Sequence, residues 1–303
     1  MNKISTRSRV KTAFVFAGGG SFGAIQVGML RALAEHGVRP DLVLGTSVGA
    51  MNAAYFAGCP TLDGVQALER VWRGLKRHDV FPVTWRSLWG FARRGDFLVS
   101  SDGLRRLCRE NLSYKDLRDA PVPVHIVATD VLTGEAVVIS DGAAEDAIVA
   151  SAAIPAAFAP VRVKDRLLVD GALTSNTPIR AAVALGAERI IVLSTGHPCV
   201  LDKAPHGAIA LALHALTLLI SRQLHIELHG LDRRVETYIV PTPCPLAGSP
   251  YDFSRTGELI DRAAESTAAW LAKGGLERKE RHHRRKRATS LGFIPAPIVA
   301  MPS

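Results

Sequence analysis

The sequence has little of what stabilises a small secreted protein or anchors a membrane protein. Its 303 residues include only four cysteines, which lie far apart without a CxxC pair, so neither a disulfide framework nor a structural zinc site is expected. We expect buried, reduced thiols and a cytoplasmic protein without metal or cofactor. Residues 1–11 have no long apolar stretch, so no signal peptide is predicted. Apolar residues make up 48% of the chain, which excludes disorder of the whole protein.

The net charge of +9 comes from the two ends of the chain. Residues 1–11 hold four basic residues, and 278–287 (RKERHHRRKR) hold seven basic residues and one acid. The remainder, 12–277, has 26 basic and 27 acidic residues and is close to neutral. We interpret the ends as solvated segments, with peripheral contact to an anionic membrane as the second interpretation. No nucleic-acid partner is expected, because no aromatic residues interleave with these charges.

Apolar runs and helical periodicity alternate along the chain, which predicts an α/β fold with a mainly parallel sheet covered on both faces. The expected strands are 13–17, 41–45, 124–130, 137–140, 161–169 (with a hairpin at 164–165), 190–194 and 238–240. The expected helices are 23–36, 48–57, 63–76, 101–111, 143–151, 178–185, 207–229 and 255–273. We predict one domain over 12–275, preceded by the basic arm 1–11 and followed by a disordered tail, 276–303.

The segment GTSVG has the GxSxG spacing of a nucleophile elbow and lies between an expected strand and an expected helix. Ser47 is the candidate nucleophile, and a side chain at Gly45 or Gly49 would clash with neighbouring backbone. Thr46 and Val48 complete the elbow, and the helix that starts at Val48 directs its positive dipole end at the serine. The alternative is a tight turn in which Ser47 merely caps that helix.

A glycine loop, GGGSFG at 18–23, also separates a strand from a helix. Its GxGxxG spacing would suit a dinucleotide, but that site needs an acid at the end of the second strand, and Asp41 lies at the other end. We expect the loop to supply backbone N–H groups to an oxyanion instead. The candidate residues are Gly18, Gly19, Gly20, Ser21 and Gly23.

The segment Asp170-Gly171-Ala172 directly follows the strand-like sequence RLLV. A serine nucleophile needs a base, and strand ends at one edge of a parallel sheet converge on one crevice, so Asp170 is the candidate. No histidine has a comparable strand-to-loop position. An ordinary α/β-hydrolase is excluded by order, because only one strand precedes the strand of Ser47.

Three blocks together resemble the bacterial patatin-like phospholipases: GGGSFGAIQVGML, GTSVGAMNAAY, and ASAAIPAAFAPV followed by LLVDGALTSNTPI. The resemblance runs from about Thr12 to Gly196. It implies a three-layer α/β/α fold and a Ser–Asp dyad of Ser47 and Asp170, with 18–23 as the oxyanion hole. Many relatives carry Arg or Lys between the last two glycines of this loop, where this chain has Phe22. The backbone N–H groups would then stabilise the oxyanion without help from a charged side chain.

The expected function is hydrolysis of carboxylic esters of phospholipids or related lipids through an acyl-serine, with Asp170 made more basic by desolvation. The alternatives are a non-catalytic lipid-binding scaffold and a serine peptidase. Five aromatic residues fall within 81–97. We interpret them as a buried packing segment, with an acyl-chain wall or an interfacial flap as the alternative. The 14 apolar residues 207–220 are too short to span a membrane and favour a buried core helix over an anchor.

Overall fold

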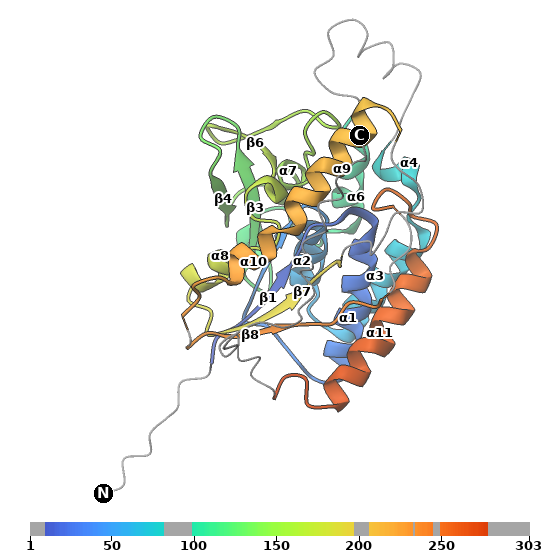
Figure 1. Cartoon of the computed structure of the whole chain (residues 1–303), viewed down its shortest axis with the longest axis vertical. Coiled ribbons are helices and arrows are strands. Elements are labelled where there is room, and N and C mark those ends of the chain that lie inside the picture. The colour runs from blue at the N-terminus through green and yellow to red at the C-terminus, as the bar shows by residue number, and fades with distance from the viewer. Residues whose placement is uncertain (1–9, 82–98, 197–205, 233, 245–248, 278–303) are drawn as a thin grey trace, which may run out of the picture.

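The computed structural model describes residues 10–81, 99–196, 206–232, 234–244 and 249–277 (Figure 1). Most of the expected basic arm and tail therefore lie outside the described residues, as does the aromatic segment beyond Phe81. In the described part of the chain, no helix is both long and apolar enough to cross a bilayer.

Eight strands of the described chain form one central sheet. They are β1 (Thr12–Phe16), β2 (Leu42–Thr46), β3 (Val124–Asp130), β4 (Ala136–Ile139), β5 (Val161–Val163), β6 (Arg166–Asp170), β7 (Arg189–Leu193) and β8 (Glu236–Ile239). The pairings β3–β2, β2–β1, β1–β7 and β7–β8 are parallel, as expected. The pairings β3–β4, β3–β6 and β5–β6 are antiparallel, so the sheet is mixed. The turns from β3 to β4 and from β5 to β6 are too short for the crossover that a parallel pair needs, so these neighbours are antiparallel.

Helices cover the sheet on both sides. Their bounds are α1 (Gly23–Glu35), α2 (Val48–Gly58), α3 (Leu62–Gly74), α4 (Arg77–Val80), α6 (Asp102–Asn111), α7 (Ala144–Ser151), α8 (Ile179–Ala184), α9 (Ala208–Ser221), α10 (Gln223–Leu228) and α11 (Thr256–Ala272). Three 3-10 turns, η1 (Gly20–Phe22), η2 (Leu117–Asp119) and η3 (Gly171–Leu173), complete the described elements. The helix expected over 207–229 is in fact two helices, with Arg222 between them.

Alternate residues of β1 serve two separate cores, which is the three-layer arrangement that the family resemblance implies. Phe14 and Phe16 pack with α1, α2, α3, α7 and α11 on one face. Ala13 and Val15 face a smaller core with α8 and α10 on the other. Figure 1 shows these two groups of helices on opposite sides of the sheet.

Polar side chains tie α1, α2 and α3 together inside the larger core. The Asn52 side-chain amide donates to Gly23 O and to Gln26 Oε1, while its oxygen accepts from Trp72 Nε1 at 2.8 Å. The Gln26 side-chain amide in turn donates to Ala17 O, directly after the end of β1, and to Leu193 O, at the end of β7. These buried groups are thereby satisfied, which avoids the cost of burying an unpaired amide.

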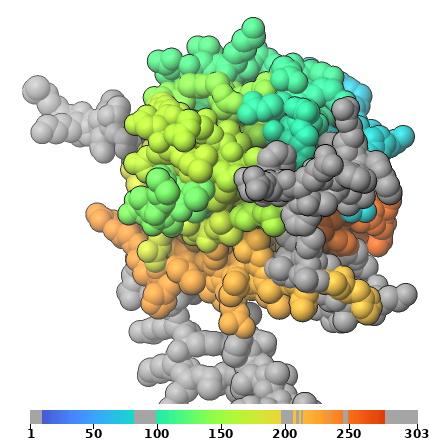
Figure 2. All heavy atoms as spheres, turned by 90° about the horizontal axis from the view of Figure 1, so that it is seen from above, coloured from blue at the N-terminus to red at the C-terminus, as the bar shows by residue number. Residues whose placement is uncertain are grey.

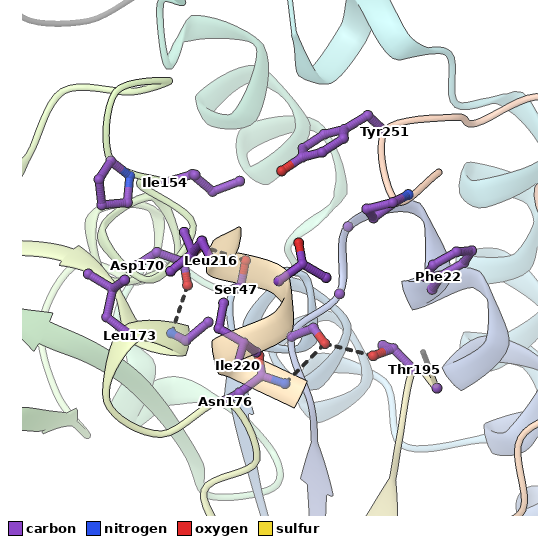
Figure 3. Close-up of a pocket in the computed structure, with 18 of the residues that line it drawn as sticks. Phe22, Ser47, Ile154, Asp170, Leu173, Asn176, Thr195, Leu216, Ile220 and Tyr251 are labelled. Carbon is purple, nitrogen blue, oxygen red and sulfur yellow. Dashed lines mark hydrogen bonds between the residues drawn. The ribbon is translucent and has the colours of Figure 1, made fainter. Parts of the chain in front are cut away.

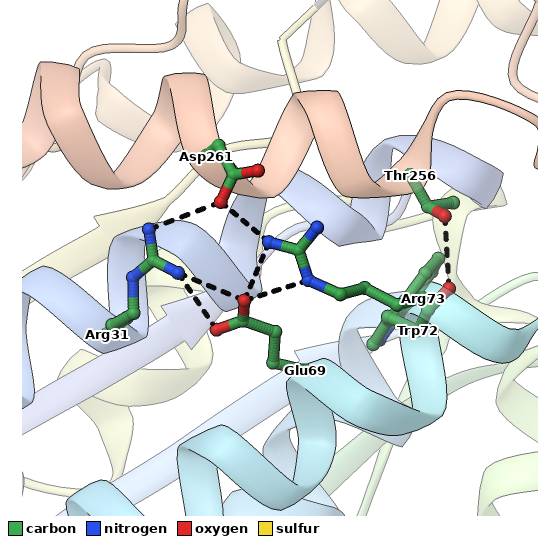
Figure 4. Close-up of polar contacts among 6 residues, drawn as sticks. All are labelled: Arg31, Glu69, Trp72, Arg73, Thr256 and Asp261. Carbon is green, nitrogen blue, oxygen red and sulfur yellow. Dashed lines mark hydrogen bonds and ion pairs between the residues drawn. The ribbon is translucent and has the colours of Figure 1, made fainter.

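A charged cluster joins α11 to α1 and α3 at the surface (Figure 4). Glu69 accepts from Arg31 at 3.0 Å and from Arg73 at 2.7 Å, and Asp261 of α11 lies 2.6 Å from Arg73. The Thr256 hydroxyl adds a hydrogen bond to Trp72 O. The C-terminal helix is therefore held by polar contacts as well as by the apolar core.

Candidate active site

Two strands meet end to end along one edge of β3. Thr46, the last residue of β2, pairs with Val127, and Asp170, the last residue of β6, pairs with Ala128. Both neighbours on β3 also pair with β4, so β2 and β6 must occupy the same opposite edge. The antiparallel β6 thus runs toward the end of β2. Ser47 and Asp170 are therefore close because an antiparallel strand runs toward a parallel one. The expected reason, that the ends of parallel strands converge, was wrong.

Ser47 occupies the sharp turn between β2 and α2 with φ 55° and ψ −126°. This is a strained backbone for a residue with a side chain, and such strain is typical of functional turns. A Cβ added at Gly45 would lie 2.2 Å from Gly49 O, and one at Gly49 would lie 2.4 Å from Phe16 O. The two glycines are therefore required by the close approach of backbone around the turn.

Ser151 holds this turn in place, although no pattern in the sequence marks it for that role. The Ser151 hydroxyl accepts from Ser47 N–H at 2.8 Å and donates to Val127 O at 2.6 Å. Ser151 is fully buried at the end of α7, over a hundred residues from Ser47 in the chain. It lies in the block ASAAIPAAFAPV, which carries part of the family resemblance but in which no residue was singled out.

The side chains of Ser47 and Asp170 are directly hydrogen-bonded. The Ser47 hydroxyl donates to Asp170 Oδ2 at 2.8 Å, and Ala172 N–H donates to the other carboxylate oxygen at 2.8 Å. Asp170 is 3% exposed. Burial raises its pKa to about 6, against the lowering effect of those two hydrogen bonds. Such a carboxylate is a stronger base than an exposed one and is still mostly ionised at neutral pH.

The glycine loop has fewer available donors than the sequence predicts. Gly18 N–H donates to Asn176 O and Ser21 N–H to Pro250 O, while Gly23 N–H closes the 3-10 turn onto Gly20 and Ser21. Within the described part of the chain, the N–H groups of Gly19 and Gly20 donate no hydrogen bond. These two amides are the free donors of the loop.

Gly19 and Gly20 are closely packed, Gly19 against the side chain of Thr195 and Gly20 against the backbone of Pro250. A Cβ at Gly19 would lie 2.3 Å from Thr195 Oγ1, and one at Gly20, whose φ is 59°, would lie 2.3 Å from Pro250 O. Thr195 also donates to Gly18 O at 2.7 Å. Thr195 and Pro250, which periodicity does not single out, therefore shape the loop.

Ser47, Asp170 and the loop residues Gly18, Gly19 and Gly20 line one cavity of about 110 Å³ (Figure 3). The remaining lining is mainly apolar: Phe22, Phe81, Ile154, Pro155, Ala172, Leu173, Leu216, Ile220, Pro250 and Tyr251, with Asn176, Thr195, Gly196 and Thr217 as further members. No histidine of the described chain is among these residues. The arrangement suits a nucleophile and a base facing an apolar substrate.

The loop after Asp170 is fastened to α10 by two polar side chains. Gln223 Nε2 donates to Ala172 O at 2.9 Å and to Leu173 O, while its oxygen accepts from Asn176 N–H. The buried Glu227 accepts from the hydroxyl of Ser175 and from Arg180 N–H. Ala172, whose N–H donates to Asp170, is thereby anchored to α10.

The thiols differ from the sequence expectation. Cys108 is buried, and burial raises its pKa to about 12, but Cys59 and Cys244 are exposed. Neither of them lines the cavity, and the fourth cysteine, Cys199, lies outside the described residues. The expectation that all thiols are buried was wrong for these two, because spacing alone does not report on exposure.

A family model of the patatin-like phospholipases matches residues 14–183. The chain is 28% identical over 197 residues to the rat patatin-like phospholipase domain-containing protein 7, a match that covers 64% of this chain and 14% of the rat protein. An uncharacterised NTE family protein of Mycobacterium tuberculosis is 28% identical over 198 residues, 63% of this chain and 51% of that protein. The chain thus matches only part of each relative.

Two solved structures are similar over most of the chain. They are VipD from Legionella pneumophila (15% identity, TM-score 0.45, 88% of this chain and 67% of that one) and human GIVD cytosolic phospholipase A2 (13%, 0.44, 88% and 58%). The family model covers more than half of the chain, including both the elbow and the aspartate. The chain belongs to the patatin-like phospholipase family.

Proposed function

We propose that this protein is a lipid acyl hydrolase that cleaves carboxylic ester bonds of phospholipids or related lipids. Ser47 is the nucleophile and Asp170 its general base. The observation that carries the proposal is the 2.8 Å hydrogen bond between the Ser47 hydroxyl and a buried carboxylate whose pKa is raised to about 6. A base poised near the working pH is the usual requirement for activating a serine.

The first half of the reaction forms an acyl-serine. Asp170 Oδ2 takes the proton of Ser47 as Oγ bonds to the ester carbonyl carbon. The carbonyl oxygen becomes an oxyanion, which the free N–H groups of Gly19 and Gly20 stabilise. The tetrahedral intermediate then collapses, the bond to the alcohol oxygen breaks, and the leaving alcohol takes the proton from Asp170.

The second half returns the enzyme to its starting state. Water attacks the acyl carbon and Asp170 accepts the proton of that water. The second intermediate collapses with release of Ser47 Oγ, which recovers its proton from Asp170, and the products are a carboxylic acid and the alcohol. Each oxyanion donor of this kind is worth about 3–4 kcal/mol in transition-state stabilisation.

The cavity lining supports a lipid ester over a peptide. Phe22, Phe81 and Ile154 surround the dyad, together with Leu216 and Ile220, and apolar walls of this kind fit acyl chains. Phe22 carries no charge, so only backbone N–H groups of the loop stabilise the oxyanion in this proposal.

A fluorophosphonate probe followed by peptide mapping tests the assignment. We expect labelling at Ser47 and hydrolysis of phospholipids and p-nitrophenyl esters in preference to peptides. Ser47→Ala should abolish labelling and ester hydrolysis with unchanged circular dichroism. Absence of turnover on every ester would favour a non-catalytic lipid-binding protein, and preferential cleavage of peptides would favour a peptidase.

A further inference from the structure

Helix α9 is apolar on two opposite faces, and only one of them faces the cavity. Leu216, Thr217 and Ile220 line the cavity with Ser47 (Figure 3). Leu211, Leu218 and Leu219, spaced i, i+7 and i+8, lie on the other face of the helix. The expectation of a buried core helix over 207–220 was wrong: none of the α9 side chains that the structure describes is buried.

The outward face of α9 continues onto α10. Leu211, Leu218 and Leu219 are 57%, 53% and 65% exposed, and Ile226 of α10 is 64% exposed. These four residues, which we call the outer apolar face, are half of the eight large hydrophobic residues that are exposed in the described chain. Figure 2 shows α9 and α10, gold to orange, along one border of the molecular surface. Such a concentration indicates an interaction surface.

The two helices that carry the outer apolar face have no exposed carboxylate, and the nearest one after α10 in the chain, Asp232, is paired with Arg234. The only carboxylate of α9 and α10 is Glu227, which is 7% exposed and accepts two hydrogen bonds inside the protein. Arg222 is exposed between the two helices, and the exposed Arg180 donates to the backbone oxygens of Ile226 and His229. A pair of helices with an exposed apolar face, an arginine between them and no exposed carboxylate of their own is complementary to acyl chains beneath anionic headgroups.

We propose that the outer apolar face docks this protein onto the surface of an anionic lipid bilayer. The leucines enter the boundary between headgroups and acyl chains, and Arg222 contacts lipid phosphates. The inference deepens the proposed function, because the same helix borders the cavity of the dyad. Gln223 and Glu227 hold α10 to the loop after Asp170, so docking fixes the cavity relative to the bilayer.

The test is vesicle binding by the full chain carrying Ser47→Ala, which removes hydrolysis from the measurement. Cosedimentation with mixed phosphatidylcholine and phosphatidylglycerol vesicles should weaken about tenfold or more in Leu218→Gln/Leu219→Gln, which corresponds to about 1.4 kcal/mol or more of lost burial. Ile226→Gln should weaken binding in the same direction. The loss should persist at high salt, because it is apolar and not electrostatic.

Matched controls separate docking from folding and from general hydrophobicity. Leu132→Gln removes a leucine that is 86% exposed in the turn after β3 and should leave binding unchanged. Leu218→Met/Leu219→Met keeps the apolar character and should also retain binding. With Ser47 intact, Leu218→Gln/Leu219→Gln should keep fluorophosphonate labelling and short-chain ester hydrolysis while losing hydrolysis of vesicle lipid.

Equal vesicle binding by the wild type and the glutamine double variant would overturn the proposal. Loss of short-chain ester hydrolysis in that variant would also overturn it, because the face would then serve packing. Vesicle binding that depends on the outer apolar face, in a protein that hydrolyses no ester, would support docking and refute only the proposed hydrolase function.

Discussion

The hydroxyl of Ser151 links the backbone of Ser47 to the backbone of Val127. It accepts from Ser47 N–H at 2.8 Å and donates to Val127 O at 2.6 Å. Val127 is the β3 residue that pairs with Thr46, one position before the residue that pairs with Asp170. One buried hydroxyl therefore fixes the strained elbow against β3, the strand that pairs with both β2, which precedes Ser47, and β6, which ends at Asp170.

Replacing Ser151 with alanine should loosen the elbow. The buried N–H of Ser47 loses its acceptor, which should cost about 1–3 kcal/mol of unfolding free energy. We expect kcat for a soluble ester to fall by roughly tenfold or more, because Ser47 is no longer held in its strained conformation. Ser151→Thr keeps the hydroxyl and should retain more activity than alanine; activity of the alanine variant equal to wild type would refute the positioning role.

The dyad itself predicts that Asp170→Asn removes nearly all ester hydrolysis, because an amide cannot accept the Ser47 proton. Alanine substitutions at His125, His197, His206 and His214 should each leave most of the activity. Initial rates on a p-nitrophenyl ester provide the measurement. A histidine variant as inactive as Ser47→Ala, with unchanged folding, would replace the dyad by a triad.

The raised pKa of Asp170 predicts the pH dependence of both activity and stability. The log of kcat/KM for a soluble ester should rise with pH up to about 6 and then level off, as the carboxyl ionises. In the folded protein the carboxyl keeps its proton to higher pH than in the unfolded chain. Its effect on stability is therefore absent at low pH, and it grows increasingly unfavourable from the unfolded pKa near 4 up to about 6.

Asp170→Asn should consequently be more stable than the wild type at neutral pH, by up to about 3 kcal/mol. The part of the difference that depends on pH should disappear below the unfolded pKa, where the Asp170 carboxyl is protonated in both the folded and the unfolded wild type. Denaturant unfolding at several pH values measures it. A stability difference that does not change with pH would contradict the assigned shift.

Substitution in the glycine loop should affect catalysis through the oxyanion donors. Gly20→Ala introduces a Cβ about 2.3 Å from Pro250 O and should lower kcat by roughly 10²–10³-fold as the free N–H moves away. Gly37→Ala is the matched control, since Gly37 also has positive φ, 70°, but has nothing within 4 Å of the added Cβ. Equal effects of the two substitutions on kcat would mean that backbone strain, and not the loop's donors, sets the loss.

The basic segment 278–287 predicts a salt-dependent contribution to vesicle binding. Deleting everything after Glu277 should leave soluble ester hydrolysis unchanged, because the candidate site lies within 18–251. The truncated protein should bind anionic vesicles more weakly than the full-length protein at low salt. The difference should shrink as salt is raised, because exposed charges are screened over about 8–10 Å near physiological ionic strength. Neutral vesicles should show little change. Equal binding of both proteins at low salt would leave the segment without a membrane role.

The local features of the site follow from the sequence. Each depends on a few neighbouring residues: Gly45 and Gly49 allow the turn at Ser47, and a strand followed by a helix predicts where that turn falls. The hairpin at 164–165 and the two basic ends likewise reflect short segments. Three such motifs in one order sufficed to indicate the family.

Contacts between distant segments were decided by the tertiary structure. Asp170 meets Ser47 because β6 runs antiparallel toward β2 along β3, whereas alternation of strands and helices predicts only parallel neighbours. Ser151 and Gln223 bind backbone groups of Ser47 and Ala172, which lie far from them in the sequence. No periodicity in the sequence marks these two residues. The leucines of α9 are apolar whether buried or exposed, and hydrophobic periodicity does not distinguish a core helix from one that presents an apolar face to the outside. Strand direction and burial depend on how the whole chain packs, and for that reason only the folded molecule decides them.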